Sequence, residues 1–123
     1  HRDLHSFPTR RSSDLALENS TMKSILVPMD TMRAALEVLQ SLPKIAEKGN
    51  PNAVSDAGVS CHLAMASLEG AMLNVRINLG MMKDEEVKDR ITREASDMLE
   101  KARTLKLDIL QRVEGVLIGS DRR

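Results

Sequence analysis

Apolar residues recur every three or four positions along most of the chain, a spacing that places them on one face of an α-helix. No stretch shows the alternation or the tight-turn pairs of a β-hairpin. The periodic positions are Met32, Ala35, Leu36, Leu39, Leu42 and Ala46 in one stretch, and Val87, Ile91, Ala95, Met98, Ala102, Leu105, Ile109 and Val113 in another. The pattern therefore predicts an all-α fold, an up-and-down helical bundle fragment of three to four helices.

The strong helix breakers are few and divide the chain into long helical stretches. They are Pro28, Pro43 and the cluster Gly49-Asn50-Pro51. A helix break is expected at Val27–Pro28, because the residue before a proline disfavours the α region, and a kink is expected at Pro43. The last helix is expected to begin at Asp84, with Glu85 and Glu86 in its first turn. The helix 29–48 is expected to start with Asp30 as its cap and to end at Gly49. The expected helices are 16–27, 29–48, 54–79 and 84–118, with a loop at 49–53 and a frayed end at 119–123.

The first fifteen residues do not read as part of a domain. The run HSFPTRRSSDL, from His5 to Leu15, resembles the translation of a DNA-sequencing adapter. It has no apolar periodicity, and Pro8 interrupts a polar sequence. Residues 1–15 are therefore expected to form an artefactual, disordered tail, and residues 16–118 are expected to be the helical domain.

Composition excludes several classes of function. The chain of 123 residues has 18 Lys and Arg against 18 Asp and Glu, one Phe, and no Trp or Tyr. Nucleic-acid binding, which needs a basic face and usually stacking aromatics, is not expected. Neither is a membrane role, since no run approaches the roughly 20 apolar residues of a membrane span. The single Cys61 and the lack of a secretion signal indicate the reducing cytoplasm. A core without aromatics is thin, so the chain is expected to depend on further chain or a partner subunit.

The helix expected at 54–79 carries a polar stripe. At 100° per residue, five of its polar residues fall within about 40° of one another. Capping explains polar residues at a helix start, and an interhelical hydrogen-bond network explains them further along. The functional alternative is a site for a polar heterocycle and for proton transfer, with a carboxylate at the helix start. The stripe consists of Asp56, Ser60, Ser67, Asn74 and Asn78.

Other reactive residues carry less weight. His62 and Arg76 point away from the stripe, and a lone His without further ligands at metal spacing is more often structural than metal-binding. No metal site is therefore expected. Cys61 is expected to be a small buried residue. No phosphate loop, nucleophile elbow or paired-carboxylate motif is present.

Two segments, in this order, give the chain a family resemblance: KGNPNAVSDAGV at 48–59 and LNVRINL at 73–79, followed by KDEE and a long amphipathic helix. Together they resemble the formimidoyltetrahydrofolate cyclodeaminase and methenyltetrahydrofolate cyclohydrolase family over roughly 22–113. The chain is similar to the C-terminal part of that domain. The further helices and the Gly-rich segment with which family members begin are missing from it.

The resemblance implies an all-α, usually dimeric enzyme of folate one-carbon metabolism. Asp56 is then the acid–base candidate, and Asn50, Ser55, Asn74 and Asn78 orient the substrate or Asp56. The tetrahydrofolate derivative is the substrate, and no separately bound cofactor is expected. A homodimer and a fused formimidoyltransferase domain are the implied partners, and the fragment by itself is expected to be inactive.

Three functions stay open at this point. The first is cyclisation of formimidoyltetrahydrofolate to methenyltetrahydrofolate with release of ammonia, and the second is hydrolysis of methenyltetrahydrofolate. The third is a noncatalytic helical dimerisation module on the same scaffold.

Overall fold

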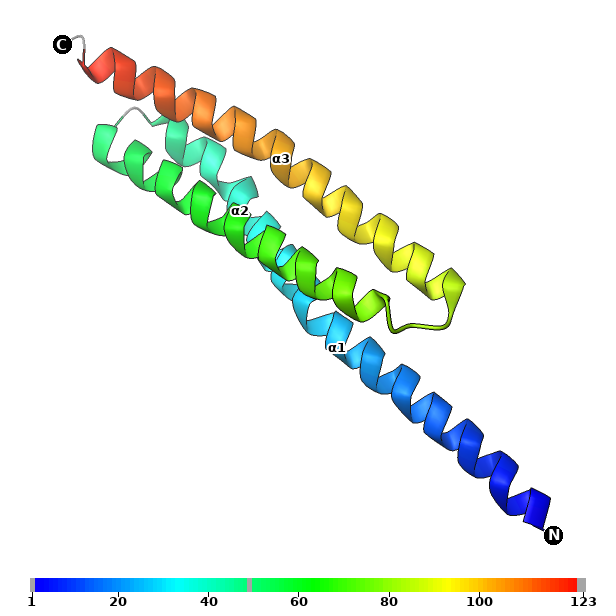
Figure 1. Cartoon of the computed structure of the whole chain (residues 1–123). Helices are drawn as coiled ribbons and strands as arrows, with labels where there is room; N and C mark the ends of the chain where they lie inside the picture. Colours follow the sequence, from blue (N-terminus) through cyan, green and yellow to red (C-terminus); the bar gives the residue numbers. More distant parts are fainter. Residues whose placement is uncertain (1, 49, 122–123) are drawn as a thin grey trace.

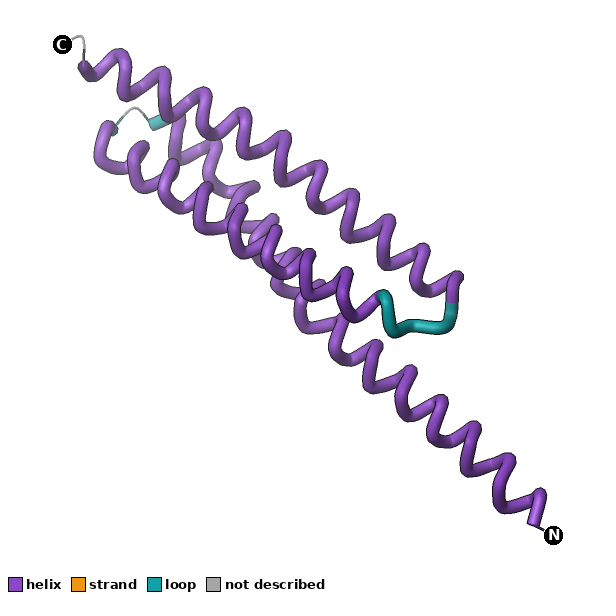
Figure 2. The backbone as a smooth tube through the Cα atoms, in the orientation of Figure 1, coloured by secondary structure: helices purple, strands orange, loops and turns teal. Residues whose placement is uncertain are grey.

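The computed structural model confirms the all-α bundle. It describes residues 2–48 and 50–121, with the side chains of 12–48 and 50–119. Three long helices, α1 (Arg2–Glu47), α2 (Pro51–Leu79) and α3 (Glu85–Asp121), run up, down and up (Figure 1). Almost all of the described chain is helical, and the described part contains no strand (Figure 2). Within these residues no helix combines the length and the apolar character needed to cross a membrane.

The core is a thin column of aliphatic side chains between the three helices. Its residues recur at helical spacing and contain no aromatic ring, as the sequence predicts. Each helix contributes one buried face, including Met32 and Leu39 from α1, Cys61, Leu68 and Val75 from α2, and Ile91, Ala102 and Ile109 from α3.

Helix α1 continues through Pro28, where the sequence analysis expected a break, so that expectation is wrong. A proline in a helix lacks the N–H that would bond to the carbonyl four residues earlier, here Ser24. In the structure Asn78 on α2 donates a hydrogen bond from Nδ2 to this Ser24 oxygen, at 3.3 Å. Pro28 itself is buried in the bundle. A contact from another helix thus satisfies the carbonyl that the proline leaves free. The same helix also runs through Pro43, and Asp30, expected to cap a helix, lies inside α1.

The N-terminal segment 2–15, expected to be a disordered tail, is helical and forms the first part of α1. In Figure 1 it extends as a single rod beyond the end of the bundle. The loop between α2 and α3 contacts α1 where this segment joins the bundle. The Glu18 carboxylate accepts hydrogen bonds from the backbone N–H groups of Lys83 and Asp84, and Lys83 Nζ lies 4.0 Å from Asp14.

Helix α2 begins three residues before the expected start at Val54. Asn50 caps it by accepting the N–H of Asn52 at its side-chain oxygen, and Pro51 occupies the first turn, where its missing N–H costs nothing. Helix α3 begins at Glu85, one residue after the expected start, because Asp84 caps it: Asp84 Oδ1 accepts the N–H of Val87 at 3.2 Å. Helix α3 continues to Asp121, past the expected frayed end at 119. The expectation that Gly49 ends the preceding helix lies outside the described residues.

Close packing at one glycine and two exposed ion pairs join α3 to its neighbours. Gly58 on α2 is buried so close to α3 that a Cβ atom there would lie 3.3 Å from Val113 Cγ1. Arg33 on α1 bonds Glu94 on α3, with Nη2 and Oε1 2.6 Å apart, and this hydrogen bond is the main cause that raises the pKa of Arg33. Arg112 similarly joins α3 to Glu47 on α1. These ion pairs are exposed, so each is worth only about 0.2–1 kcal/mol.

Candidate functional site

The first turns of α2 bring three of the predicted site residues together. Asn50 caps the helix, and Ser55 donates its hydroxyl to the Asn52 carbonyl at 3.0 Å. Asp56 follows on the next position and its side chain is exposed. Among the described side chains, no hydrogen bond or ion pair occupies its carboxylate. Asn50 and Ser55 therefore shape the helix start, while Asp56 stays free for a ligand.

The last turns of α2 hold the other two predicted residues. Asn74 is exposed, whereas Asn78 is half-buried and bonds to Ser24 on α1. Asn78 therefore has a structural role, joining α2 to α1, that the sequence did not predict. The signal for it was present in the sequence, because Pro28 leaves the Ser24 carbonyl without its helical partner.

The two groups lie far apart within one chain. At a rise of 1.5 Å per residue, Asp56 and Asn74 are separated by about 27 Å along α2, and Asp56 and Asn78 by about 33 Å. A shared helix face does not make a shared site over such lengths. One copy of the chain thus brings Asp56 together with Asn50 and Ser55, but not with Asn74 or Asn78.

Between its two ends, the polar stripe borders an open groove between α1 and α2. The groove has a volume of about 500 Å³ and is mostly apolar, with hydroxyl groups from both helices. Ser60 and Ser67 of the stripe lie along one wall, and Thr31 and Val38 of α1 along the other. A mostly apolar cleft with a few polar groups is the usual setting for a small heterocyclic ligand.

Comparison with known proteins decides the family. A model of the formiminotransferase-cyclodeaminase family matches residues 8–97, which is most of the chain. The chain belongs to this family. The resemblance seen in the motifs at 48–59 and 73–79 is thereby confirmed, and the matched range starts inside the segment 1–15.

Relatives in the family carry two names. The chain is 31% identical over 110 residues to formimidoyltransferase-cyclodeaminase of Dictyostelium discoideum, a match that covers 89% of the chain and 20% of the relative. It is 35% identical over 88 residues to methenyltetrahydrofolate cyclohydrolase of Methylorubrum extorquens, covering 72% and 42%. Formimidoyltransferase-cyclodeaminase of Rattus norvegicus is 28% identical over 89 residues, covering 72% and 16%. The chain therefore spans less than half the length of each of these family members.

An interhelical hydrogen-bond network was the alternative explanation for the polar stripe, and it accounts for only one of the five residues. Among the described side chains, Asn78 alone makes a hydrogen bond from the stripe to another helix. Asp56, Ser60, Ser67 and Asn74 make none. The bond from Asn78 to α1 fixes the register of the two helices, and this role explains Asn78. The other four residues need another explanation.

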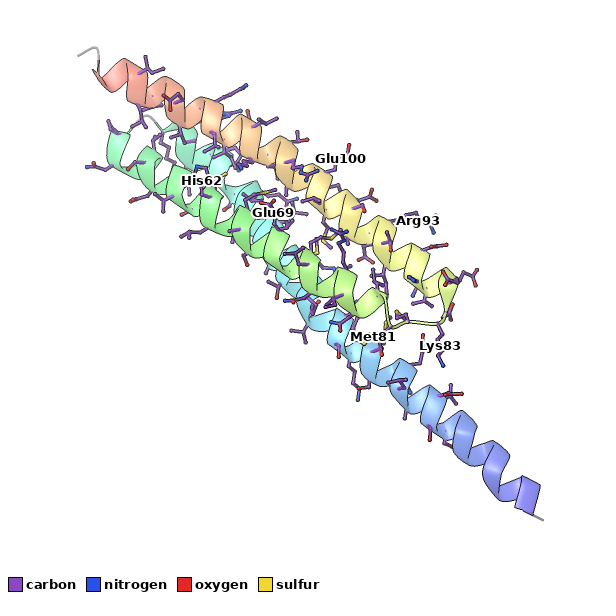
Figure 3. All side chains as sticks on the ribbon, in the orientation of Figure 1. His62, Glu69, Met81, Lys83, Arg93 and Glu100 are labelled. Atoms are coloured by element: carbon purple, nitrogen blue, oxygen red, sulfur yellow. The ribbon has the colours of Figure 1, made fainter. Side chains whose placement is uncertain are left out.

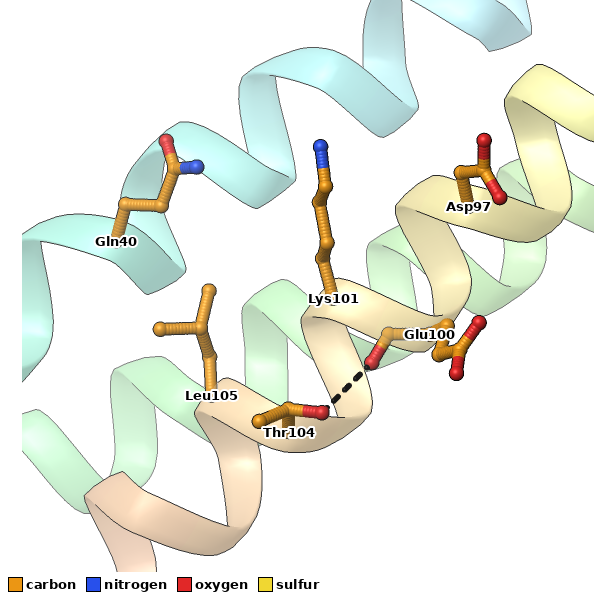
Figure 4. A pocket seen from close by; sticks show the side chains of 6 residues that line it. All are labelled: Gln40, Asp97, Glu100, Lys101, Thr104 and Leu105. Carbon is orange, nitrogen blue, oxygen red and sulfur yellow. Dashed lines mark hydrogen bonds between the residues drawn. The ribbon is translucent and has the colours of Figure 1, made fainter.

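A second groove lies between α1 and α3, but the residues that line it do not form a binding or catalytic site. It has a volume of about 460 Å³ and is lined by Gln40, Asp97, Glu100, Lys101, Thr104 and Leu105 (Figure 4). The Thr104 hydroxyl donates a hydrogen bond to the Glu100 carbonyl of its own helix, at 3.2 Å. The charged side chains are exposed, and opposite signs neighbour one another. This is the solvated face of a helix pair.

The remaining reactive residues do not converge. His62 and Glu69 lie on α2, and Lys83 lies in the loop between α2 and α3 (Figure 3). Across the described residues, no group of three His, Cys, Asp or Glu side chains is placed to hold a metal ion. The prediction that Cys61 is a buried core residue is confirmed, and burial raises the pKa of its thiol.

Proposed function

We propose that the protein to which this chain belongs cyclises formimidoyltetrahydrofolate to methenyltetrahydrofolate and releases ammonia. The observation that carries this proposal is the family match over residues 8–97, together with a free, exposed carboxylate at Asp56 inside the motif that gives the resemblance. Its relatives in Dictyostelium discoideum and Rattus norvegicus are named for this activity.

The reaction explains why a positioned carboxylate is useful. A second nitrogen of the substrate forms a bond to the one-carbon centre, and the bond from that carbon to the departing nitrogen breaks. The departing nitrogen takes up a proton and leaves as ammonia. A carboxyl group that transfers a proton at this step typically raises the rate about 100-fold to 10,000-fold. We assign this role to Asp56, with Asn50 and Ser55 positioning it or the substrate.

A second candidate is hydrolysis of methenyltetrahydrofolate to the formyl form. The 35% identical relative in Methylorubrum extorquens, which carries the cyclohydrolase name, favours it. The same carboxylate suits this reaction, because water must lose a proton as it attacks the same carbon. In both cases the folate derivative is the substrate, and the proposal includes no separately bound cofactor.

The oligomeric state, the fused domain and the location of the protein are part of the same proposal. We expect a homodimer, a formimidoyltransferase domain fused to the cyclodeaminase form, and a cytoplasmic location in keeping with the single unpaired Cys61. Since the chain spans less than half of its relatives, we expect it to be inactive alone and active within the complete protein.

The test is an assay of the complete protein with both folate derivatives, following methenyltetrahydrofolate by absorbance and ammonia by a coupled assay. Methenyl accumulation with ammonia release supports the cyclodeaminase, and methenyl decay well above the buffer rate supports the cyclohydrolase. A folded protein with neither activity would leave the noncatalytic dimerisation module.

Two variants then test the assignment of Asp56. Asp56→Asn is expected to lower turnover by about 100-fold or more with an unchanged melting temperature. Asp97→Asn, which removes another exposed carboxylate on α3, is the matched control and should leave turnover unchanged. Full activity of Asp56→Asn removes Asp56 from the mechanism.

A further inference from the structure

The last turns of α2 and the first turns of α3 border a groove, the α2–α3 groove, that the proposed function does not use. It has a volume of about 480 Å³ and is mostly apolar. A cleft of this size, with a few polar groups on apolar walls, is the usual form of a small-molecule site. Its apolar lining comes from Met72 and Leu79 of α2 and from Leu99 of α3.

The charged side chains that line the α2–α3 groove are both cations. Arg76 comes from the last turn of α2, and Lys88 comes from the first turn of α3. Within the described part of the chain, neither of them forms an ion pair with a carboxylate. The two arginines that join α3 to α1, Arg33 and Arg112, are each paired. The positive charge of the α2–α3 groove is therefore left uncompensated by the fold.

Lys88 lies where the fold alone does not favour a cation. The first turn of a helix carries the positive end of the helix dipole, so a positive side chain there is unfavourable. Lys88 is also half-buried, which removes part of its hydration. Arg76 has a simpler explanation, because the negative end of the dipole favours a cation in the last turn of α2. An anion bound in the α2–α3 groove would offset both costs at Lys88.

Two hydroxyl groups of α3 also line the α2–α3 groove, and they differ in what they can bind. The Thr92 hydroxyl donates to the Lys88 carbonyl of its own helix, at 2.8 Å, so its oxygen is left only to accept. Ser96, one turn further along, is exposed and makes no side-chain hydrogen bond to a described residue, so its hydroxyl can donate to an anion. A guanidinium, an ammonium and a hydroxyl group together supply the donors that bind an oxyanion most strongly.

A narrower continuation of the groove, with a volume of about 210 Å³, has a different charge. Glu69 and Arg103 line it together, and Arg76 lines both parts. The opposite charges of Glu69 and Arg103 offset each other there. The net positive charge is therefore concentrated at Arg76 and Lys88, and the anionic group of a ligand belongs at that end.

We propose that the α2–α3 groove binds a small organic phosphate, with Arg76, Lys88 and Ser96 on the phosphate group and the apolar side chains of the groove against its organic body. A phosphate monoester carries nearly two negative charges at neutral pH and three acceptor oxygens, which matches two cations and a hydroxyl group. A carboxylate would leave one of the two cations without its charge. Arg76 lies about 30 Å along α2 from Asp56, so this site is separate from the proposed folate chemistry.

Calorimetric titration of the complete protein tests the class of ligand. The probe is phenyl phosphate, which is compared with benzoate, phenol and inorganic phosphate. Phenyl phosphate is expected to bind at least about tenfold more tightly than each of the other three, because it alone combines a doubly charged group with an apolar body. Benzoate that binds as tightly as phenyl phosphate would show that the groove takes a carboxylate instead. No binding of phenyl phosphate overturns the site.

Substitutions of single cations locate the bound phosphate. Lys88→Gln and Arg76→Gln are each expected to lower the affinity for phenyl phosphate at least about tenfold, because each removes a charged donor. Arg93→Gln is the matched control, since Arg93 is an exposed residue of α3 that lines neither part of the groove, and it should leave the affinity unchanged (Figure 3). Unchanged affinity in Lys88→Gln, or an equal loss in Arg93→Gln, would mean that phenyl phosphate binds elsewhere.

The melting temperature separates a binding role of Lys88 from a structural one. Without ligand, Lys88→Gln should melt at or above the temperature of the parent protein, because it removes a cation from the positive end of a helix dipole. Saturating phenyl phosphate should raise the melting temperature of the parent protein but not that of Lys88→Gln. Ser96→Glu, which adds a carboxylate at an exposed position of the groove, should also abolish this rise while the fold is kept. A Lys88→Gln protein that melts lower than the parent and responds equally to phenyl phosphate would overturn the site.

Discussion

Asn78 on α2 donates a hydrogen bond to the backbone oxygen of Ser24 on α1, the carbonyl that Pro28 deprives of its own helical partner. We predict that Asn78→Ala lowers the free energy of unfolding by about 1 kcal/mol, the usual net worth of such a bond. In a Pro28→Ala background the loss should shrink, because residue 28 then supplies an N–H to Ser24.

A double-mutant cycle in urea measures this coupling. Asn78→Ala, Pro28→Ala and the double variant are compared with the parent chain, and residues that share one contact should be non-additive by about 0.5 kcal/mol or more. Asn74→Ala, one turn away and exposed, is the control and should change stability little. Strict additivity of the two substitutions would contradict the compensation.

Glu18 makes a second long-range contact, between α1 and the start of α3. Its carboxylate accepts from the backbone N–H groups of Lys83 and Asp84, where the positive end of a helix dipole also favours negative charge. Glu18→Ala should lower the free energy of unfolding by about 0.5–1.5 kcal/mol. Amide hydrogen exchange at Lys83 and Asp84 should accelerate, whereas Glu37→Ala, at an exposed position of the same helix, should leave both amides unchanged. Equal exchange in the two variants would argue against the contact.

The sequence predicted what depends on neighbours in the chain. The apolar period of α3 predicted its buried face, including Ile91 and Ala102, and the start of this helix was predicted to within one residue. The break at Pro28 was wrong because the residue that compensates it, Asn78, lies 54 positions from Ser24 along the chain. Local propensity cannot register a contact from another helix.

The sequence predicted that the residues of the polar stripe share one face of α2, but not how far apart they lie along the helix. A helical wheel placed Asp56 and Asn74 on one face of α2, and both residues are exposed. The wheel ignores distance along the axis, which separates the two residues by about 27 Å.

The thiol of Cys61 should be slow to react. Burial raises its pKa, and Lys106 only partly opposes this, so less thiolate is present at pH 8 than for an exposed cysteine. Because the thiolate is the reactive form, we expect modification by a disulfide reagent to be at least about tenfold slower than for an exposed thiol. Ser96→Cys in a Cys61→Ala background provides that exposed thiol on α3. Comparable rates for the two proteins at pH 8 would show that Cys61 is accessible.

The two glycines Gly58 and Gly115 should respond oppositely to added side chains. At Gly58 a Cβ atom would already lie 3.3 Å from Val113 Cγ1, so Gly58→Leu must push α2 and α3 apart and should lower the free energy of unfolding by about 1–3 kcal/mol. At Gly115 a Cβ atom would meet nothing within 4 Å, so Gly115→Ala should gain about 0.5–1 kcal/mol from helix propensity. Urea unfolding of both variants measures these changes. A neutral Gly58→Leu would mean that α3 packs less closely on α2 near Val113 than the structure shows, while a destabilising Gly115→Ala would reveal a neighbour for that glycine.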